Sequence, residues 1–390
     1  MFDWIKLSDE LDEVLFDHAA STPPLPIVKK VAQDFIDNYG SIHRGNSQRS
    51  FRSSEKYEAA RASIANLFQR SPEEVVFTAN TTTAINLLAS LLPPPLNIAV
   101  TRGEHSANLL PWINFRHRLF FLPWLESADI DPEELRQFLR NHKIALLSVA
   151  AASNLSGRHL KDIGKVHAVC VQEETLFMLD ACQYVPHYGS HQLSADIIAF
   201  SGHRAYAPYG AGALIAPVRV LRGNPLGTYT GGGNVTYIDE HLHSSYKMPP
   251  WNHEIGTPNG LGAVTMAAGL EFINQHRLEI AVYETDMTRS MADLRERLQV
   301  QGMVAVGAED GPVLAIGGDK ERVLKLEEWL QDHKIAYRAG NFCVYEALRH
   351  YLGTDNPEEV YMVRLSGGLF THLERAVNIL NQLGDFVQKL

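Results

Sequence analysis

Ala195-Asp-Ile-Ile-Ala-Phe-Ser-Gly-His-Arg-Ala-Tyr-Ala-Pro-Tyr-Gly-Ala-Gly-Ala-Leu214 contains two apolar runs joined by a polar loop. Short apolar runs bounded by glycine and proline are typical of buried strands. We therefore expect one strand over residues 197–200 and another over residues 210–217. The loop between them, Ser201-Gly202-His203-Arg204, then lies at the end of a buried strand.

Helical and strand-like patterns alternate outward from this stretch through the first two thirds of the chain. This alternation is typical of an α/β fold with a largely parallel sheet. Further strands are expected over residues 74–78, 144–150 and 176–179. Helices are expected over residues 53–68, 84–92 and 260–275.

Beyond about residue 280 the pattern changes to helix–strand–helix, which predicts a smaller α+β lobe. Its helices are expected over residues 283–298, 320–333 and 371–383. Its strands are expected over residues 313–316, 336–338 and 363–365.

The composition narrows the class of protein. The chain has 390 residues, 45% of them hydrophobic, which allows a large core in two lobes. Its net charge of −10 argues against nucleic-acid binding, which needs a basic face. Residues 1–13 lack the basic region and apolar run of a signal peptide, and no long uninterrupted apolar stretch predicts a membrane span. We therefore expect a cytoplasmic protein without membrane contact.

Polar residues cluster at four junctions between predicted elements, at residues 79–83, 104–108, 180–183 and 201–204. Ligands of α/β proteins bind outside the carboxyl ends of strands. Hydroxyls and free backbone N–H groups at a helix N-terminus also suit a phosphate. Each cluster alone has an ordinary explanation as a helix cap, a strand end or a surface histidine. Their joint order along the chain is the specific signal.

That order resembles the class V aminotransferase family and, within it, cysteine desulfurases of the SufS and NifS type. The stretch from Phe200 to Leu214 is similar to the segment that carries the family's cofactor lysine. Other segments match the family in the same order: 16–26 (FDHAASTPPLP), 38–45 (NYGSIHRG), 152–157 (ASNLSG) and 254–259 (EIGTPN). The resemblance therefore extends over almost the whole chain.

The resemblance implies the fold and the assembly. The fold is the pyridoxal 5'-phosphate (PLP)-dependent transferase fold of type I, an α/β fold with a mostly parallel seven-stranded sheet, flanking helices and a smaller α+β lobe. The large PLP-binding domain is expected over residues 15–265, and the small domain over residues 1–14 and 266–390. The implied partners are a second subunit in a homodimer, a small amino-acid substrate and, for a desulfurase, a protein that accepts sulfur.

The resemblance also assigns roles in binding PLP. The phosphate contacts are Thr81, Thr82, Ser201 and His203, with Thr257 contributed by a second subunit. His105 would stack on the pyridine ring. Asp180 would keep the ring nitrogen protonated so that the ring can accept electrons. Gln183 would contact the phenolic oxygen of the ring.

The substrate contacts implied by the resemblance are Asn154, Arg338 and Arg364, of which Asn154 and Arg364 would hold the carboxylate of an amino acid. A guanidinium suits that bidentate task. We expect no metal site. The three cysteines, Cys170, Cys182 and Cys343, have neither a disulfide framework nor zinc-ligand spacing, and we expect the first two to be structural.

Cys343 is a candidate catalytic residue. Residues 338–343 resemble the R-x-G-x-x-C loop of SufS-type desulfurases, whose cysteine takes sulfur from the substrate as a persulfide. Val344-Tyr345-Glu346 follow it, however, where that family has a small residue and then proline. Residues 340–353 are equally similar to a desulfurase-like subfamily with tyrosine at the cysteine position. Both interpretations stay open, as does a structural role for Cys343 under a loop.

Arg204 stands where the family has its lysine, and the nearest lysines are Lys165 and Lys247. A buried lysine can lose its proton and attack an aldehyde, but a guanidinium stays charged. Three explanations remain open. Arg204 replaces an original lysine by a charge-preserving substitution, or the natural protein is a noncatalytic binding or regulatory protein. In the third, PLP or its amine form binds noncovalently and His203 or His105 moves protons.

The resemblance thus predicts a PLP-dependent protein acting on a small amino acid, with sulfur transfer from L-cysteine as the parent activity. A transaminase, a C–S lyase or an epimerase of the same family is the alternative enzyme. Arg204 decides whether the chain turns over substrate at all.

Overall fold

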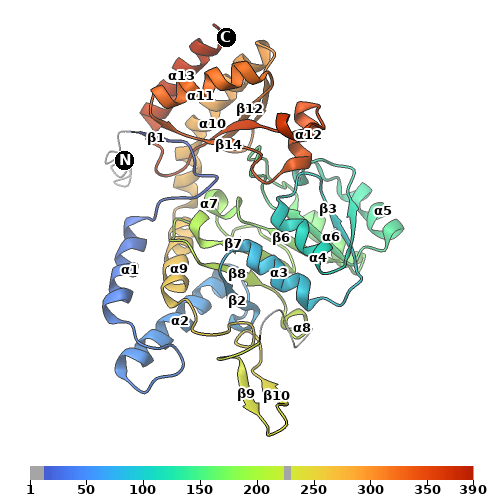
Figure 1. Ribbon diagram of the computed structural model, residues 1–390, viewed down its shortest axis with the longest axis vertical. Coiled ribbons are helices and arrows are strands. Elements are labelled where there is room, and N and C mark those ends of the chain that lie inside the picture. Colours follow the sequence, from blue (N-terminus) through green and yellow to red (C-terminus); the bar gives the residue numbers. More distant parts are fainter. Residues whose placement is uncertain (1–12, 224–229, 390) are drawn as a thin grey trace.

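Among residues 13–223 and 230–389, which the computed structural model of the protein describes, seven strands form the central sheet (Figure 1). In their order across the sheet they are β2 (Val75–Thr78), β8 (Gly212–Ile215), β7 (Ile197–Ser201), β6 (Leu176–Asp180), β5 (Leu146–Ala150), β3 (Asn97–Val100) and β4 (Arg118–Phe121). The strands from β7 to β4 are parallel, and β8 runs antiparallel to both of its neighbours. The predicted mostly parallel seven-stranded sheet is confirmed.

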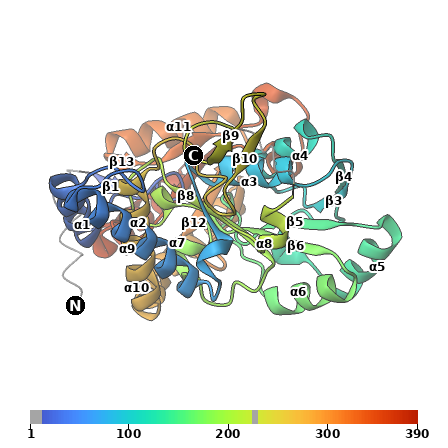
Figure 2. The ribbon, with the colours of Figure 1, turned by 90° about the horizontal axis from the view of Figure 1, so that it is seen from below.

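Helices cover both faces of this sheet because alternate side chains of each buried strand point to opposite faces. Met178 and Leu214 pack into the core under one set of helices: α3 (Thr81–Leu91), α4 (Leu110–Asn114) and α8 (Val218–Leu221). Phe177 and Ala213, each one residue away, pack under the other set: α1 (Pro26–Asn38), α2 (Gln48–Leu67), α5 (Pro132–His142), α6 (Ile163–Gln172) and α9 (Gly260–Gln275). Figure 2 shows α3 and α4 on one side of the strands and α6 on the other.

The C-terminal part forms a second, smaller group of strands and helices, coloured orange to red in Figure 1. Its antiparallel sheet has the order β11 (Val304–Gly307), β12 (Val313–Gly317), β15 (Met362–Ser366) and β14 (Arg338–Gly340). Its helices are α10 (Arg277–Val300), α11 (Lys320–Asp332), α12 (Tyr345–Leu352) and α13 (Leu373–Val387). The domain boundaries proposed from the sequence stay a prediction, and residues 1–12 of the small domain lie outside the described residues.

Short elements complete the fold. β1 (Val14–Leu15) pairs in parallel with β13 (Ile335–Ala336) and so joins the start of the described chain to the C-terminal part. α7 (Val185–Tyr188) follows β6. The hairpin of β9 (Val235–Ile238) and β10 (Ser244–Tyr246) projects from the end of the molecule opposite the C-terminal helices (Figure 1). Within the described ranges, none of the helices combines the length and apolar character that crossing a membrane requires.

The structure corrects one predicted strand. The sequence predicts a single strand over residues 336–338, but the chain forms β13 and β14 there, with Tyr337 between them. β13 pairs with β1 and β14 pairs with β15, so the chain changes partners at Tyr337. A local pattern cannot show this, because both pairing partners lie far away in the sequence.

A buried ion pair holds the start of the sheet to the helices beside it. The Arg61 side chain is 0% exposed and donates hydrogen bonds to both carboxylate oxygens of Glu254, each at 2.7 Å, and to the Val75 carbonyl at 2.6 Å. Glu254 also accepts from the Phe77 backbone N–H at 2.8 Å and from the Tyr57 hydroxyl at 2.7 Å. These contacts connect α2, β2 and the loop before α9.

We expect Glu254→Ala to lower the free energy of unfolding by about 3 kcal/mol, because it removes the buried carboxylate that accepts from Arg61, Tyr57 and Phe77 and leaves Arg61 only its contact with Glu58 at 2.8 Å. Denaturant unfolding measures this change. The matched control is Glu133→Ala, which removes a carboxylate that is 77% exposed and pairs with Arg136 on the surface. That variant should lose less than about 1 kcal/mol. Equal losses in the two variants would contradict the assignment of Glu254 as a buried anchor.

Candidate functional site

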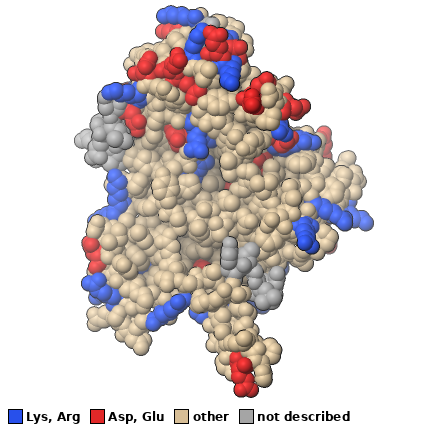
Figure 3. All heavy atoms as spheres, in the orientation of Figure 1, with Lys and Arg blue, Asp and Glu red and all other residues tan. Residues whose placement is uncertain are grey.

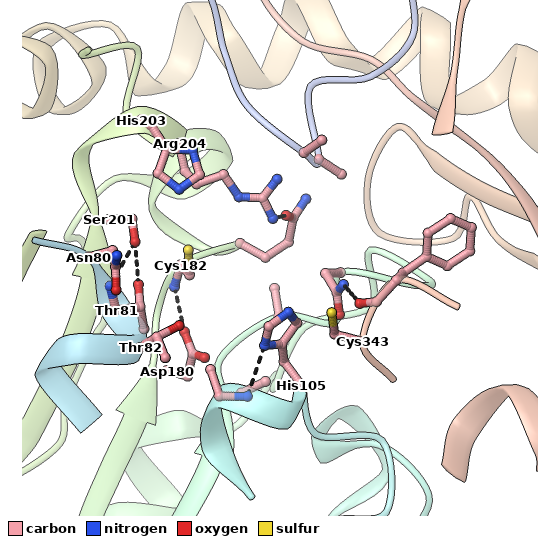
Figure 4. A pocket seen from close by; sticks show the side chains of 18 of the residues that line it. Asn80, Thr81, Thr82, His105, Asp180, Cys182, Ser201, His203, Arg204 and Cys343 are labelled. Carbon is pink, nitrogen blue, oxygen red and sulfur yellow. Dashed lines mark hydrogen bonds between the residues drawn. The ribbon is translucent and has the colours of Figure 1, made fainter. Parts of the chain in front are cut away.

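A cavity of about 310 Å³ lies at the carboxyl ends of the central strands. Parallel strands end at one edge of a sheet, so polar residues that follow different strands meet there. The cavity brings together all the site residues predicted from the sequence except Thr257: Thr81, Thr82, His105, Asn154, Asp180, Gln183, Ser201, His203, Arg204, Arg338, Cys343 and Arg364. Figure 4 shows this arrangement from close by, and Figure 3 shows the hollow between the C-terminal helices and the rest of the molecule.

Hydroxyl groups line one wall of the cavity at the start of α3. Ser201, the last residue of β7, accepts a hydrogen bond from the Thr81 backbone N–H at 2.8 Å, and its Oγ lies 2.7 Å from Thr81 Oγ1. Thr82 lies beside them (Figure 4). A Cβ at Gly212 would come within 2.7 Å of Asn80 Cα, so glycine lets β8 approach the start of α3 this closely. Hydroxyls at a helix N-terminus suit an oxyanion.

Asp180 and His105 lie on two further sides of the cavity. Burial raises the pKa of the Asp180 carboxyl to about 6, although the Cys182 backbone N–H donates to it at 3.0 Å. Burial, and then the charges of Arg204 and Arg364, lower the pKa of His105 to about 4. His105 Nδ1 accepts from the Ala107 backbone N–H at 3.1 Å, so its hydrogen is on Nε2. A carboxylate and a neutral aromatic ring suit a flat ligand with a protonated ring nitrogen.

Arg204 enters the cavity from the short helical turn that follows β7, Gly202–Arg204. It is 6% exposed, donates from Nη1 to the His18 carbonyl at 3.2 Å, and donates from Nη2 to Gln183 Oε1. Among the described residues, no carboxylate oxygen lies within 4.0 Å of its guanidinium nitrogens. Arg204 therefore places a permanent charge in the cavity wall without an adjacent counter-charge.

A chain of buried polar side chains leads from Arg204 to α10. Gln183 Nε2 lies 3.4 Å from His187 Nε2, and His187 Nδ1 lies 2.9 Å from Glu284 Oε1. Since Gln183 Oε1 accepts from Arg204, its amide nitrogen donates to His187, which in turn donates from Nδ1 to Glu284. The sequence analysis named Gln183 but missed His187 and Glu284. His187 lies one helical turn after Gln183, but nothing local identifies Glu284.

Arg364 lies on β15 at the opposite side and is 2% exposed. Its Nη1 donates to the Asn154 carbonyl at 2.8 Å, its Nη2 lies 3.6 Å from Asp17 Oδ1, and its guanidinium stacks on the Phe342 ring. Burial, and then the charge of Arg204, lower the pKa of Arg364 to about 9. Arg338 on β14 lies opposite Arg364 in the antiparallel register of β14 and β15. Three arginines therefore reach the same cavity.

Cys343 is exposed and lies at the edge of the cavity on a strained loop. Phe342 and Cys343 both have left-handed backbone angles, with φ of 50° and 60°, which are uncommon for residues other than glycine. Hydrogen bonds from outside the loop hold this conformation. The Ser106 backbone N–H donates to the Cys343 carbonyl at 2.9 Å, and Asn154 Nδ2 donates to the Phe342 carbonyl at 3.0 Å. Strain of this kind persists where the surroundings impose it.

The remaining predicted residues are placed as follows. Thr257 is exposed in the loop before α9 and does not line the cavity. Its contribution to a second subunit stays a prediction. Cys170 is buried in α6, in agreement with a structural role. Cys182, also expected to be structural, lines the cavity beside Asp180, and its structural role stays a prediction (Figure 4).

Comparisons with known proteins agree with this geometry. The model of the family described as aminotransferase class-V matches residues 14–376. A cysteine desulfurase of Cronobacter sakazakii is 29% identical over 350 residues, which cover 86% of this chain and 85% of that protein. The cysteine desulfurase CsdA of Escherichia coli K12 is 27% identical, with 86% of each chain covered.

Solved structures show the same fold. The apo structure of a cysteine desulfurase from Thermococcus onnurineus NA1 superposes with a TM-score of 0.84 at 24% identity, covering 99% of this chain and 96% of that one. A crystal structure of Escherichia coli CsdA gives a TM-score of 0.80 at 25% identity, covering 100% and 99%. With its family match over almost the whole length, this chain belongs to the class V aminotransferase family and is similar to its cysteine desulfurases.

Proposed function

We propose that this protein binds PLP noncovalently in the cavity, together with a small amino acid held by its carboxylate. Sulfur transfer from L-cysteine is the parent activity, which the chain would regain with lysine at position 204. One observation carries the proposal: Arg204 lies inside a cavity whose other predicted contacts, apart from Thr257, are all present. A guanidinium stays protonated and cannot form the covalent imine that a lysine forms.

The chemistry of the donor set fits PLP. Thr81, Thr82 and Ser201 present hydroxyls at the start of α3, which suit the phosphate. Asp180 would pair with the protonated ring nitrogen, and His105 presents a neutral ring for stacking. When bound, PLP supplies an electron-accepting pyridine ring. Nothing at position 204 offers the nucleophile for a covalent bond.

The two histidines differ in what they can do with a proton. The hydrogen bond from Ala107 occupies Nδ1 of His105, so His105 presents only Nε2–H to a ligand. His203 Nδ1 lies 3.4 Å from the Ser21 hydroxyl, which can donate or accept, so both tautomers of His203 are available. Burial lowers the pKa of His203 to about 4, which leaves it neutral at pH 7. We therefore infer that His203, rather than His105, can offer a ring nitrogen that accepts a hydrogen bond from a ligand.

We expect purified protein to bind added PLP with a change in visible absorbance and a rise in melting temperature. Borohydride should leave that PLP removable by dialysis, because no imine links it to the chain. In the matched variant Arg204→Lys, borohydride should attach PLP covalently to the protein. This variant should release alanine from L-cysteine, and the unchanged protein should not. The proposal fails if PLP neither alters the absorbance nor shifts the melting temperature.

We expect Cys343→Ser, made in an Arg204→Lys background, to lower sulfur transfer at least about a hundredfold. In that step the Cys343 thiol takes the sulfur atom of L-cysteine, forming a persulfide and leaving alanine. The measurement is alanine release with a thiol acceptor present. Cys170→Ser, which changes a buried residue of α6, is the control and should keep the activity. Equal activity of the serine and cysteine forms at position 343 would remove Cys343 from the reaction.

We expect Asp180→Asn to stabilise the PLP-free protein while weakening PLP binding. Burial raises the Asp180 pKa from 3.8 to about 6, so the native state binds this proton more tightly than the unfolded chain does. The free energy of unfolding therefore falls as pH rises between these values, by at most about 3 kcal/mol. In the Asp180→Asn variant, this contribution to the pH dependence of the free energy of unfolding should be absent. Its PLP affinity should fall about tenfold or more, because the ring nitrogen loses a charged partner.

Chemical denaturation between pH 4 and pH 7.5 measures the slope, and absorbance titration measures PLP affinity. Glu104 is buried with a pKa raised to about 7 and contributes a slope of the same sign, which Asp180→Asn leaves in place. Asp162→Asn, at an exposed carboxylate paired with Lys165, is the control and should change neither quantity. A variant that is less stable than the unchanged protein at pH 7.5 would contradict the assignment.

A further inference from the structure

We propose that Arg204 and Arg364 together bind a small dicarboxylic acid, so that the preferred ligand beside the cofactor carries two acidic groups. This inference rests on the proposed function, because it places the cofactor phosphate at Thr81 and Ser201 and the ligand elsewhere in the cavity. The proposed ligand is therefore neither a neutral amino acid nor the cofactor phosphate, but an acid with two carboxylates.

The charge of the cavity wall is the first argument. The residues that line it, all within the described ranges, include three arginines and one acidic residue, Asp180. Asp180 is committed to the ring nitrogen in the proposed function. His105 and His203 are neutral at pH 7 because burial and the nearby arginines lower their pKa values to about 4. The protein side of the cavity therefore carries an excess of positive charge, which the cofactor phosphate would balance in part and further anionic groups of a ligand would balance in full.

Arg204 is built into this wall as a fixed cation. The His18 carbonyl and Gln183 Oε1 each accept one of its hydrogen bonds, and the chain through His187 to Glu284 fixes which end of the Gln183 amide faces it. Both acceptors are neutral, so they orient the guanidinium without cancelling its charge. Figure 4 shows the guanidinium pointing away from Ser201 and Thr81, where the phosphate would bind. A second anion is its natural partner.

Arg364 supplies the second half of the site. It is 2% exposed, and its Nε is buried without a hydrogen-bond partner among the described residues. Its nearest carboxylate, Asp17, lies at 3.6 Å, beyond ordinary hydrogen-bond length. Arg204 and Arg364 both line the cavity, and burial followed by the charge of Arg204 lowers the pKa of Arg364. A ligand with two carboxylates would relieve the repulsion between these two cations.

A neutral amino acid fits this wall less well. Its carboxylate would satisfy Arg364, but its ammonium group would then share the cavity with the permanent charge of Arg204. A lysine at position 204 can lose its proton and avoid that repulsion, whereas an arginine cannot. The change from lysine to arginine therefore shifts the preference of the cavity from neutral amino acids toward dicarboxylic acids.

Calorimetric titration at constant ionic strength, in a buffer free of phosphate and sulfate, tests the proposal. The probes are succinate and L-aspartate, each compared with its singly acidic counterpart, butyrate and L-alanine. We expect the dicarboxylates to bind about 10- to 100-fold more tightly, the range for a hydrogen bond to a charged group. The difference between succinate and L-aspartate shows whether an ammonium group is tolerated. Equal affinity for singly and doubly acidic probes overturns the proposal.

Arg204→Gln should reduce the preference for each dicarboxylate over its singly acidic counterpart to within about threefold. Arg219→Gln removes an exposed arginine of α8 outside the cavity and should keep the preference. A preference that survives Arg204→Gln overturns the proposal. If that variant does not fold, the affinities of the unchanged protein for the singly and doubly acidic probes still test the proposal.

Each titration is run with and without PLP, whose binding is followed separately by absorbance. Dicarboxylate selectivity without any PLP binding would sink the proposed function and leave only the binding of a dicarboxylic acid by Arg204 and Arg364. PLP binding without a preference for dicarboxylates would overturn this inference and leave the proposed function standing.

Discussion

The parallel pairing of β5, β6 and β7 is the constraint on which the site depends. In this register Asp180 lies between Ala150 and Ala199, and Ser201 ends the next strand, so both side chains reach the same edge of the sheet. The strands are buried on both faces, and a slip of one residue would move every side chain to the opposite face. The packing of the core therefore fixes the positions of the polar residues at the strand ends.

A permanent charge buried at this edge changes the chemistry of its neighbours. Arg204 is oriented by a carbonyl and an amide rather than by a carboxylate. Burial, and after it the charge of Arg204, lowers the pKa values of His105, His203 and Arg364. A lysine in the same place could become neutral, whereas the arginine cannot. At the position of the family's lysine, the arginine offers no nucleophile and keeps its positive charge in the cavity. Both proposals for this protein follow from that one residue.

The C-terminal part completes the cavity from the other side. Arg364 lies on a strand of the smaller sheet, and Cys343 lies on a loop held in a left-handed conformation by Ser106 and Asn154. Glu284, at the end of the chain of polar side chains that begins at Arg204, lies on α10. The position of the C-terminal part therefore affects the orientation of Gln183 and of Arg204.

The sequence by itself determined the α/β fold and the mostly parallel sheet, because apolar periodicity reports burial. Its resemblance to the class V aminotransferase family named the residues expected at the edge of that sheet. It also identified Arg204 as the exceptional residue. Only the tertiary structure decided what surrounds Arg204, that Cys182 lines the cavity and that residues 336–338 divide between two strands. The physical reason is that these features depend on contacts between segments far apart in the chain. Local patterns show which face of an element is buried, but not which distant residue covers it.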